Sequence, residues 1–176
     1  MKMCLVIKYY VLLAFIITIS ALSCKHANTS ISSDFKIVAS FSPGLSPWRP
    51  WDTTINSNGD VQQVIYFWLH DDNISKPQII ALKISQQDLH DLVAVIEREQ
   101  FFTLKSKYSR RETDGPTLVI TVSTPEITHA VSVYYPHFML GKSEIQRFLK
   151  IWDEILMKVP APNKSQTAGS IKAIRR

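Results

Sequence analysis

Hydrophobic and polar positions along the 176-residue chain follow two different periods. Between Ser85 and about Gln100, the apolar residues Leu89, Leu92, Val93 and Ile96 recur at intervals of three and four. This spacing places them on one stripe of an α-helix, opposite a polar face. The segment therefore predicts an amphipathic helix whose apolar stripe must be covered by other elements of the fold.

A second amphipathic helix is predicted over Glu144–Lys158, close to the end of the chain. Both helices are preceded by a capping-box pattern, in which a serine is followed three residues later by a polar acceptor. The pairs are Ser85 with Asp88, and Ser143 with Gln146. The apolar stripe of the second helix consists of Ile145, Phe148, Leu149, Trp152, Ile155 and Leu156.

The remaining apolar runs alternate with period two or are rich in β-branched and aromatic residues, which predicts strands. Asn58-Gly59 predicts a tight turn between the second and third runs, and Thr124-Pro125-Glu126 predicts a hairpin between the last two. With two amphipathic helices, this order predicts an α+β fold with a mainly antiparallel sheet of about six strands and both helices on one face. The predicted strands are 35–41, 52–55, 61–70, 78–84, 118–123 and 127–135.

The N-terminus has the composition of a secretory signal. A basic stretch, Met1–Lys8, precedes 14 uncharged apolar residues, Tyr9–Leu22, a run that is short for a membrane-spanning helix. The run ends in Ala21-Leu22-Ser23-Cys24 and resembles the lipobox of bacterial lipoprotein precursors. The resemblance implies cleavage between Ser23 and Cys24 and a lipid thioether, completed by acyl chains such as palmitate, on Cys24.

The same resemblance bears on location. Lys25 follows the cysteine where the family's inner-membrane retention signal has Asp, so the outer membrane is favoured over the inner one. A plain secretory signal, or an uncleaved membrane anchor with a chance cysteine, is the alternative interpretation of the segment. If residues 1–23 are removed, Cys24 is the only cysteine left, so no intramolecular disulfide can form in the processed chain.

Composition divides the chain into a signal peptide (1–23), a polar tether with the anchor (24–34), one domain (35–159) and a basic tail (160–176). Pro160 ends the last helix, and the tail after it is expected to be disordered. The formal charge of +5 belongs to the two ends, because residues 24–159 hold 14 basic and 15 acidic side chains. This balance argues against nucleic acid as a partner.

No residue pattern indicates catalysis. None of the five histidines belongs to an H-E-x-x-H motif, and His70-Asp71-Asp72-Asn73 lacks the spacing of a calcium loop. Gly44–Pro47 does not match the G-x-S-x-G motif of serine hydrolases. We therefore expect a protein that is not an enzyme and that has neither a metal site nor a cofactor.

Two polar or aromatic loops are the remaining candidates for function. Trp48, Arg49 and Trp51 stand among three prolines, and large side chains on a rigid loop are typical of protein-binding surfaces. The alternative is that both tryptophans fold back and cap the core. The charged loop Lys105–Asp114 is expected to be solvated.

From about Asn58 to Val159, the order of these features is similar to that of a class of small bacterial domains. The matching features are the Asn58-Gly59 turn, the leucine-rich helix, Phe101-Phe102, Asp114 and the final helix. Many members of this class are uncharacterised lipoproteins, and the emfourin protease inhibitors have a similar layout. The resemblance implies binding of a partner protein, with inhibitor and immunity protein as two versions of that role.

The sequence thus predicts a non-catalytic envelope lipoprotein that binds a periplasmic or envelope protein. A small-ligand-binding protein or enzyme, with a pocket between the sheet and the helices, is the second hypothesis. A purely structural envelope component is the third. The oligomeric state stays open.

Overall fold

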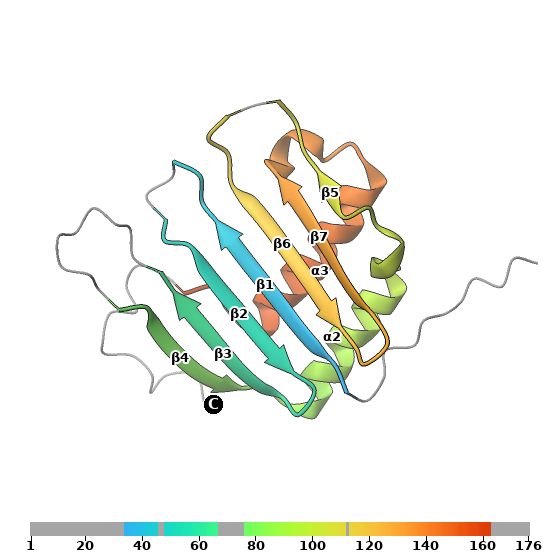
Figure 1. The fold of residues 1–176 in the computed structure, drawn as a ribbon. Coiled ribbons are helices and arrows are strands. Elements are labelled where there is room, and N and C mark those ends of the chain that lie inside the picture. Colours follow the sequence, from blue (N-terminus) through green and yellow to red (C-terminus); the bar gives the residue numbers. More distant parts are fainter. Residues whose placement is uncertain (1–33, 46–47, 67–75, 112, 163–176) are drawn as a thin grey trace, which may run out of the picture.

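The computed structural model describes residues 34–45, 48–66, 76–111 and 113–162. Seven strands form one sheet in the order β4-β3-β2-β1-β6-β7-β5 (Figure 1). All neighbours are antiparallel except β5 and β7, which are parallel. The strands are β1 (Lys36–Ser42), β2 (Trp51–Asn56), β3 (Asp60–Ile65), β4 (Gln78–Lys83), β5 (Lys107–Tyr108), β6 (Thr117–Ser123) and β7 (Thr128–Tyr134).

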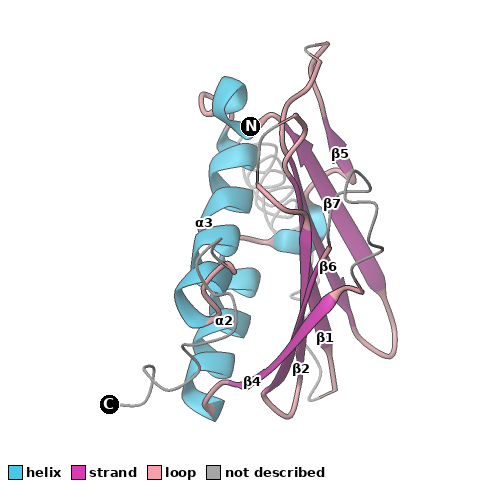
Figure 2. Cartoon of the chain, turned by 90° about the vertical axis from the view of Figure 1, so that its left-hand side faces the viewer, coloured by secondary structure: helices cyan, strands magenta, loops and turns pink. Residues whose placement is uncertain are grey.

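Two helices, α2 (Gln86–Arg98) and α3 (Ser143–Lys158), lie side by side on one face of this sheet (Figure 2). The predicted α+β fold, with a mainly antiparallel sheet and both helices on one face, is therefore confirmed. No described element covers the opposite face, which we call the open face. The two-layer arrangement follows from the two amphipathic helix stripes and the half-apolar strands, since each buries its apolar side against the other.

The strand predictions hold for six of the seven strands, with shifted ends. The predicted third strand, 61–70, is described only to Tyr66, and its strand ends at Ile65. The two-residue strand β5 was not predicted, because Lys107–Tyr108 lies within a polar stretch. Tyr108 is nevertheless buried, and β5 pairs with β7, a partner that lies more than 20 residues away in sequence.

The core lies between the helices and the sheet and contains only a few polar side chains. The predicted stripe of α2 is largely correct: Leu89, Leu92 and Ile96 are buried, whereas Val93 is half-buried and Val95 is buried instead. In α3, Ile151 is buried although it lies beside the predicted stripe. Helix–helix packing widens each buried face beyond one row of side chains, and this accounts for both differences.

The first predicted capping box is confirmed, and the second is wrong. The Ser85 hydroxyl accepts a hydrogen bond of 3.0 Å from the Asp88 backbone N–H and donates one of 2.6 Å to the Asp88 carboxylate. Helix α3, in contrast, has Lys142 as its N-cap residue and no side-chain cap. The extended backbone of Lys142 starts the helix one residue earlier than predicted, so Ser143 is already helical, and the Gln146 amide donates to the Leu140 carbonyl.

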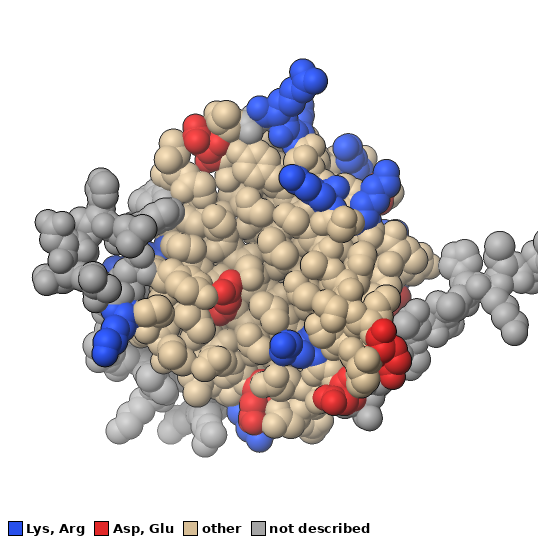
Figure 3. Space-filling view, in the orientation of Figure 1, with Lys and Arg blue, Asp and Glu red and all other residues tan. Residues whose placement is uncertain are grey.

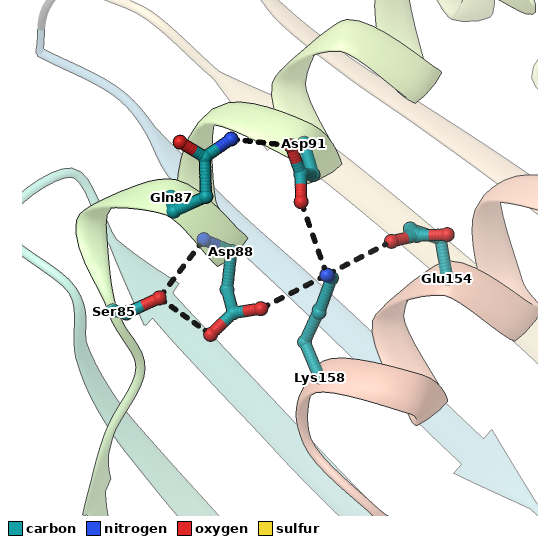
Figure 4. A network of polar contacts seen from close by, with 6 residues as sticks. All are labelled: Ser85, Gln87, Asp88, Asp91, Glu154 and Lys158. Atoms are coloured by element: carbon teal, nitrogen blue, oxygen red, sulfur yellow. Dashed lines mark hydrogen bonds and ion pairs between the residues drawn. The ribbon is translucent and has the colours of Figure 1, made fainter.

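A lysine joins the end of α3 to the first turns of α2 (Figure 4). Lys158 Nζ lies 2.9 Å from Asp88, 3.3 Å from Asp91 and 3.5 Å from Glu154, and its side chain is 18% exposed. The hydrogen bond from Ser85, followed by that from Lys158, lowers the pKa of Asp88, while Gln87 and Lys158 lower that of Asp91. The same pairs, Asp88 first, raise the pKa of Lys158.

We expect Lys158→Met to lower the thermal midpoint by about 2–4 °C at neutral pH, because three carboxylates lose their shared cation. The folded-state pKa values of Asp88 and Asp91 lie below the ordinary value of 3.8. The contribution of these two ionised carboxylates to folding stability is therefore present above about pH 3.8, and it is lost as the pH falls through their folded-state pKa values. Calorimetry of both proteins across this range should show the two midpoints converging in acid.

Lys83→Met is the matched control, since Lys83 on the edge strand β4 and Asp60 on β3 form an exposed pair at 3.2 Å. Its effect should be smaller than that of Lys158→Met. Equal effects of the two substitutions would contradict a special role for Lys158 in joining the helices.

Candidate partner-binding surface

The structure separates the two tryptophans of the proline-rich loop. Trp51 opens β2 and is only 5% exposed, with its ring 5.8 Å from that of Phe41 and 5.6 Å from that of Trp152. It therefore joins the sheet to α3 and serves the core. Trp48 is 51% exposed, and Arg49 is half-buried. Of the three predicted partner-binding side chains, Trp51 is withdrawn from the surface, and Trp48 and Arg49 stay accessible.

The start of this loop is locked against a second loop by a glycine. Gly44 has a φ of +64°, and a Cβ there would lie 2.4 Å from the Asp114 carbonyl oxygen and 2.6 Å from that of Gly115. Only a residue without a side chain permits this approach. The next residue, Leu45, donates its N–H to the Asp114 carbonyl at 3.4 Å, and its side chain is 79% exposed. An apolar side chain is thus held in solvent by a fixed backbone.

A row of aromatic side chains extends from the second loop, which contains Asp114 and Gly115, toward α3. The backbone of Gly115 lies against the Tyr135 ring, where a Cβ would meet the ring at 1.4 Å, and its N–H donates to the Tyr134 hydroxyl at 3.0 Å. The ring of Tyr135 lies 4.7 Å from that of Phe138, which is 55% exposed. Arg110 donates to the Phe138 carbonyl at 2.9 Å, and its guanidinium lies 5.8 Å from the centre of the Phe138 ring.

These contacts bring together side chains from three separate loops at the end of the sheet where β1 and β7 finish and β6 begins (Figure 1). We call this region the loop-end surface and define it by its exposed apolar residues. Tryptophan and arginine are enriched in protein-binding hot spots, whereas leucine is under-represented there. The members are Leu45, Trp48, Phe138 and Leu140, each at least 47% exposed.

Three of these four residues were not among the sequence-predicted site residues. Leu45 lies in the same proline-rich run as Trp48, and Phe138 ends the aromatic run Tyr134–Phe138, so each had a local signal in the sequence. Their juxtaposition depends on the contact of Gly44 with Asp114 and Gly115, which no local pattern indicates.

The open face offers a contrasting surface (Figure 3). Its strands present mainly Val, Thr, Ser and Ala, for example Val38, Thr54 and Thr121, which lie side by side in the register. Its central carboxylate, Asp52, accepts a hydrogen bond of 2.6 Å from the Tyr66 hydroxyl, and this bond raises the pKa of Tyr66. Half-polar faces of this kind are usual on solvated antiparallel sheets.

Among the described residues, the other candidate sites do not form a further cluster of functional side chains. Ser23, Cys24 and His70–Asn73 lie outside the described residues. Within the described ranges, no group of three or more His, Cys, Asp or Glu is placed to hold a metal ion. His129 Nε2 lies 3.0 Å from the Leu104 carbonyl, and its ring packs against Phe101, which is a structural role.

The helices of the described part are too short or too polar to cross a membrane. No model of a known protein family matches the sequence, and no significantly similar curated protein is found.

Proposed function

We propose that this protein is a non-catalytic lipoprotein of the bacterial cell envelope, anchored through lipid on Cys24, and that its loop-end surface binds a partner protein. The anchor rests on the lipobox-like Ala21-Leu22-Ser23-Cys24 and its preceding apolar run. The binding role rests on the loop-end surface. Inhibition of an envelope enzyme and neutralisation of a toxin are two forms that this binding can take.

The observation that carries the binding role is the exposure of Leu45 and Phe138 on rigid backbone. Leu45 is 79% and Phe138 55% exposed, although each follows a segment fixed by close backbone contacts. A fixed backbone reduces the conformational entropy that is lost on binding, so more of the free energy of burying these side chains contributes to affinity. An apolar group linked in this way is typical of an interaction site.

The place where the tether would join the domain, at the start of β1, is consistent with a binding role for the loop-end surface. Residues 25–34 would lead from Cys24 to Phe35, which precedes β1, and β1 ends at Ser42 beside the loop-end surface. Seven residues of extended strand span roughly 20 Å. The start of β1, which the tether precedes in the sequence, and the loop-end surface therefore lie at opposite ends of this strand.

The test is photo-cross-linking in the native cell. A photoreactive amino acid is introduced at position 45 or 138, and at position 157 as the control, because Met157 is 68% exposed on the helical layer. We expect a defined protein adduct from the first two positions and none from the third. The pair Leu45→Ser and Phe138→Ser should abolish the adduct formed from position 48 while leaving the unfolding midpoint nearly unchanged.

The anchor is tested in the same cells with Cys24→Ser. We expect the wild-type protein in the membrane fraction, with an intact mass equal to the chain from Cys24 plus lipid, and the variant without that mass increment. Adducts of equal yield from all three positions would contradict the assigned surface. A wild-type chain with no lipid would contradict the anchor and leave the surface to be judged by cross-linking alone.

A further inference from the structure

Basic side chains that form no ion pair with another described residue flank the loop-end surface. Lys107, Arg111 and Lys142 are exposed and form no ion pair with any other described residue. Elsewhere on the domain, Lys83, Arg98, Lys150 and Lys158 are each paired with a carboxylate. Cations without an ion pair to a described residue thus lie beside the exposed apolar group, as others do elsewhere on the domain, at Lys36 and Lys76.

Charged side chains are distributed unevenly over the open face (Figure 3). Lys and Arg gather at the upper right, over β5 and the loops near it, and Asp and Glu gather toward the lower right, at the opposite end of β6 and β7. In the sequence, segments 105–116 and 136–144 contain five basic residues and three acidic ones, Glu112, Asp114 and Glu144. The fold therefore places a positive region next to Phe138, where the Arg110 guanidinium lies over the ring, although residues 24–159 as a whole are close to neutral.

The described acidic side chains of this region offset part of its positive charge. The pKa of Glu144 is lowered mainly by its own backbone N–H and by Ser143, and also by Lys105 and Lys142, so Glu144 is ionised at neutral pH and balances part of the charge of these lysines. Arg147, farther along α3, donates to the carbonyls of Glu99 and Gln100 at 2.7 Å and is used inside the fold. Lys107, Arg111 and Lys142 thus belong to a region in which basic side chains outnumber acidic ones.

We propose that the partner presents an acidic segment to this region, with its carboxylates meeting Lys107, Arg111 and Lys142 while apolar side chains contact Phe138 and Leu45. The inference rests on the proposed function and names the chemistry of its partner. Complementary charge around an apolar centre steers association and selects among partners. An anionic membrane is the other surface that cations attract, but β1 places this region away from the end that carries the tether.

The test uses a fluorescent polyglutamate peptide and the full chain in detergent at low and high salt. We expect binding that weakens about tenfold when salt screens the charges, and a similar loss at low salt for the triple variant Lys107→Glu, Arg111→Glu, Lys142→Glu. Lys36→Glu is the matched control, because Lys36 is exposed at the opposite end of β1. If the triple variant fails to fold, the corresponding three changes to Gln replace it.

Absence of polyglutamate binding by the wild-type chain, or equal binding by the triple variant, would overturn the inference. Vesicles containing phosphatidylglycerol are offered in parallel to the Cys24→Ser chain. Binding to them without binding to polyglutamate would replace the acidic protein segment with a lipid surface. Loss of polyglutamate binding together with intact cross-linking from position 45 would leave the proposed function standing and remove only its acidic partner.

Discussion

Trp51→Ala should lower the free energy of unfolding by about 3–5 kcal/mol, the usual loss for deleting a large buried aromatic side chain. The ring of Trp51 lies between those of Phe41 and Trp152, so its removal leaves a cavity where the sheet meets α3. The neighbouring side chains belong to a strand and a helix and cannot collapse freely into that space. Urea unfolding of the wild-type and variant proteins measures the loss.

Trp48→Ala provides the control for this prediction within the same loop. Because Trp48 is 51% exposed, its deletion should cost about 1 kcal/mol or less. The binding effects should be reversed: Trp48→Ala weakens cross-linking to the partner, whereas its stability stays close to that of the wild type. Equal destabilisation by both substitutions would show that Trp48 also belongs to the core and would remove it from the loop-end surface.

Gly44→Ala should destabilise the domain by about 2–3 kcal/mol, since two costs combine. A φ of +64° is unfavourable for any residue with a side chain, and the new Cβ would lie 2.4 Å from a backbone oxygen of Asp114. Relief requires separation of the two loops, which also breaks the hydrogen bond of Leu45 to Asp114. The variant should therefore lose partner cross-linking from position 45 as well as stability.

Gly141→Ala is the matched control for the glycine substitution. A Cβ at Gly141 meets no atom within 4 Å, and its φ is outside the left-handed region. Replacing a glycine under these conditions leaves stability unchanged or raises it by about 0.4–1 kcal/mol, because the unfolded chain loses conformational freedom. A loss from Gly141→Ala equal to that from Gly44→Ala would show that the contact with Asp114 and Gly115 is not the cause.

Periodicity predicted most of the elements correctly because it reports which side of each element is buried. The stripe of Leu89, Leu92 and Ile96 is buried against the sheet, and the alternation around Ile37 and Ala39 places both of them in the core. The cap at Ser85 was also predictable, since it depends on hydrogen bonds between residues three positions apart. The apparent cap at Ser143 was misleading, because the backbone of Lys142, and not the serine side chain, starts α3.

The proline-rich loop is a case that the local sequence pattern could not decide. Trp48 and Trp51 have the same composition around them, and sequence alone offered core and surface as alternatives for both. Trp51 is buried because it lies opposite Phe41 in the β1–β2 register, on the helical side of the sheet. Trp48 precedes the strand and has no such position. The register, which depends on pairing between distant backbone segments, separates two residues that are alike in sequence.

The sequence by itself determined the α+β class, the order of six strands and two helices, and the lipoprotein-like N-terminus, because each depends on residues close together in the chain. Only the tertiary structure decided that β5 joins β7, that Trp51 serves the core, and that Leu45 and Phe138 lie at the same end of the sheet. These features arise from the approach of Gly44 to Asp114 and Gly115, and from strand pairing over long separations. Such contacts depend on how the elements are packed, which local periodicity does not encode.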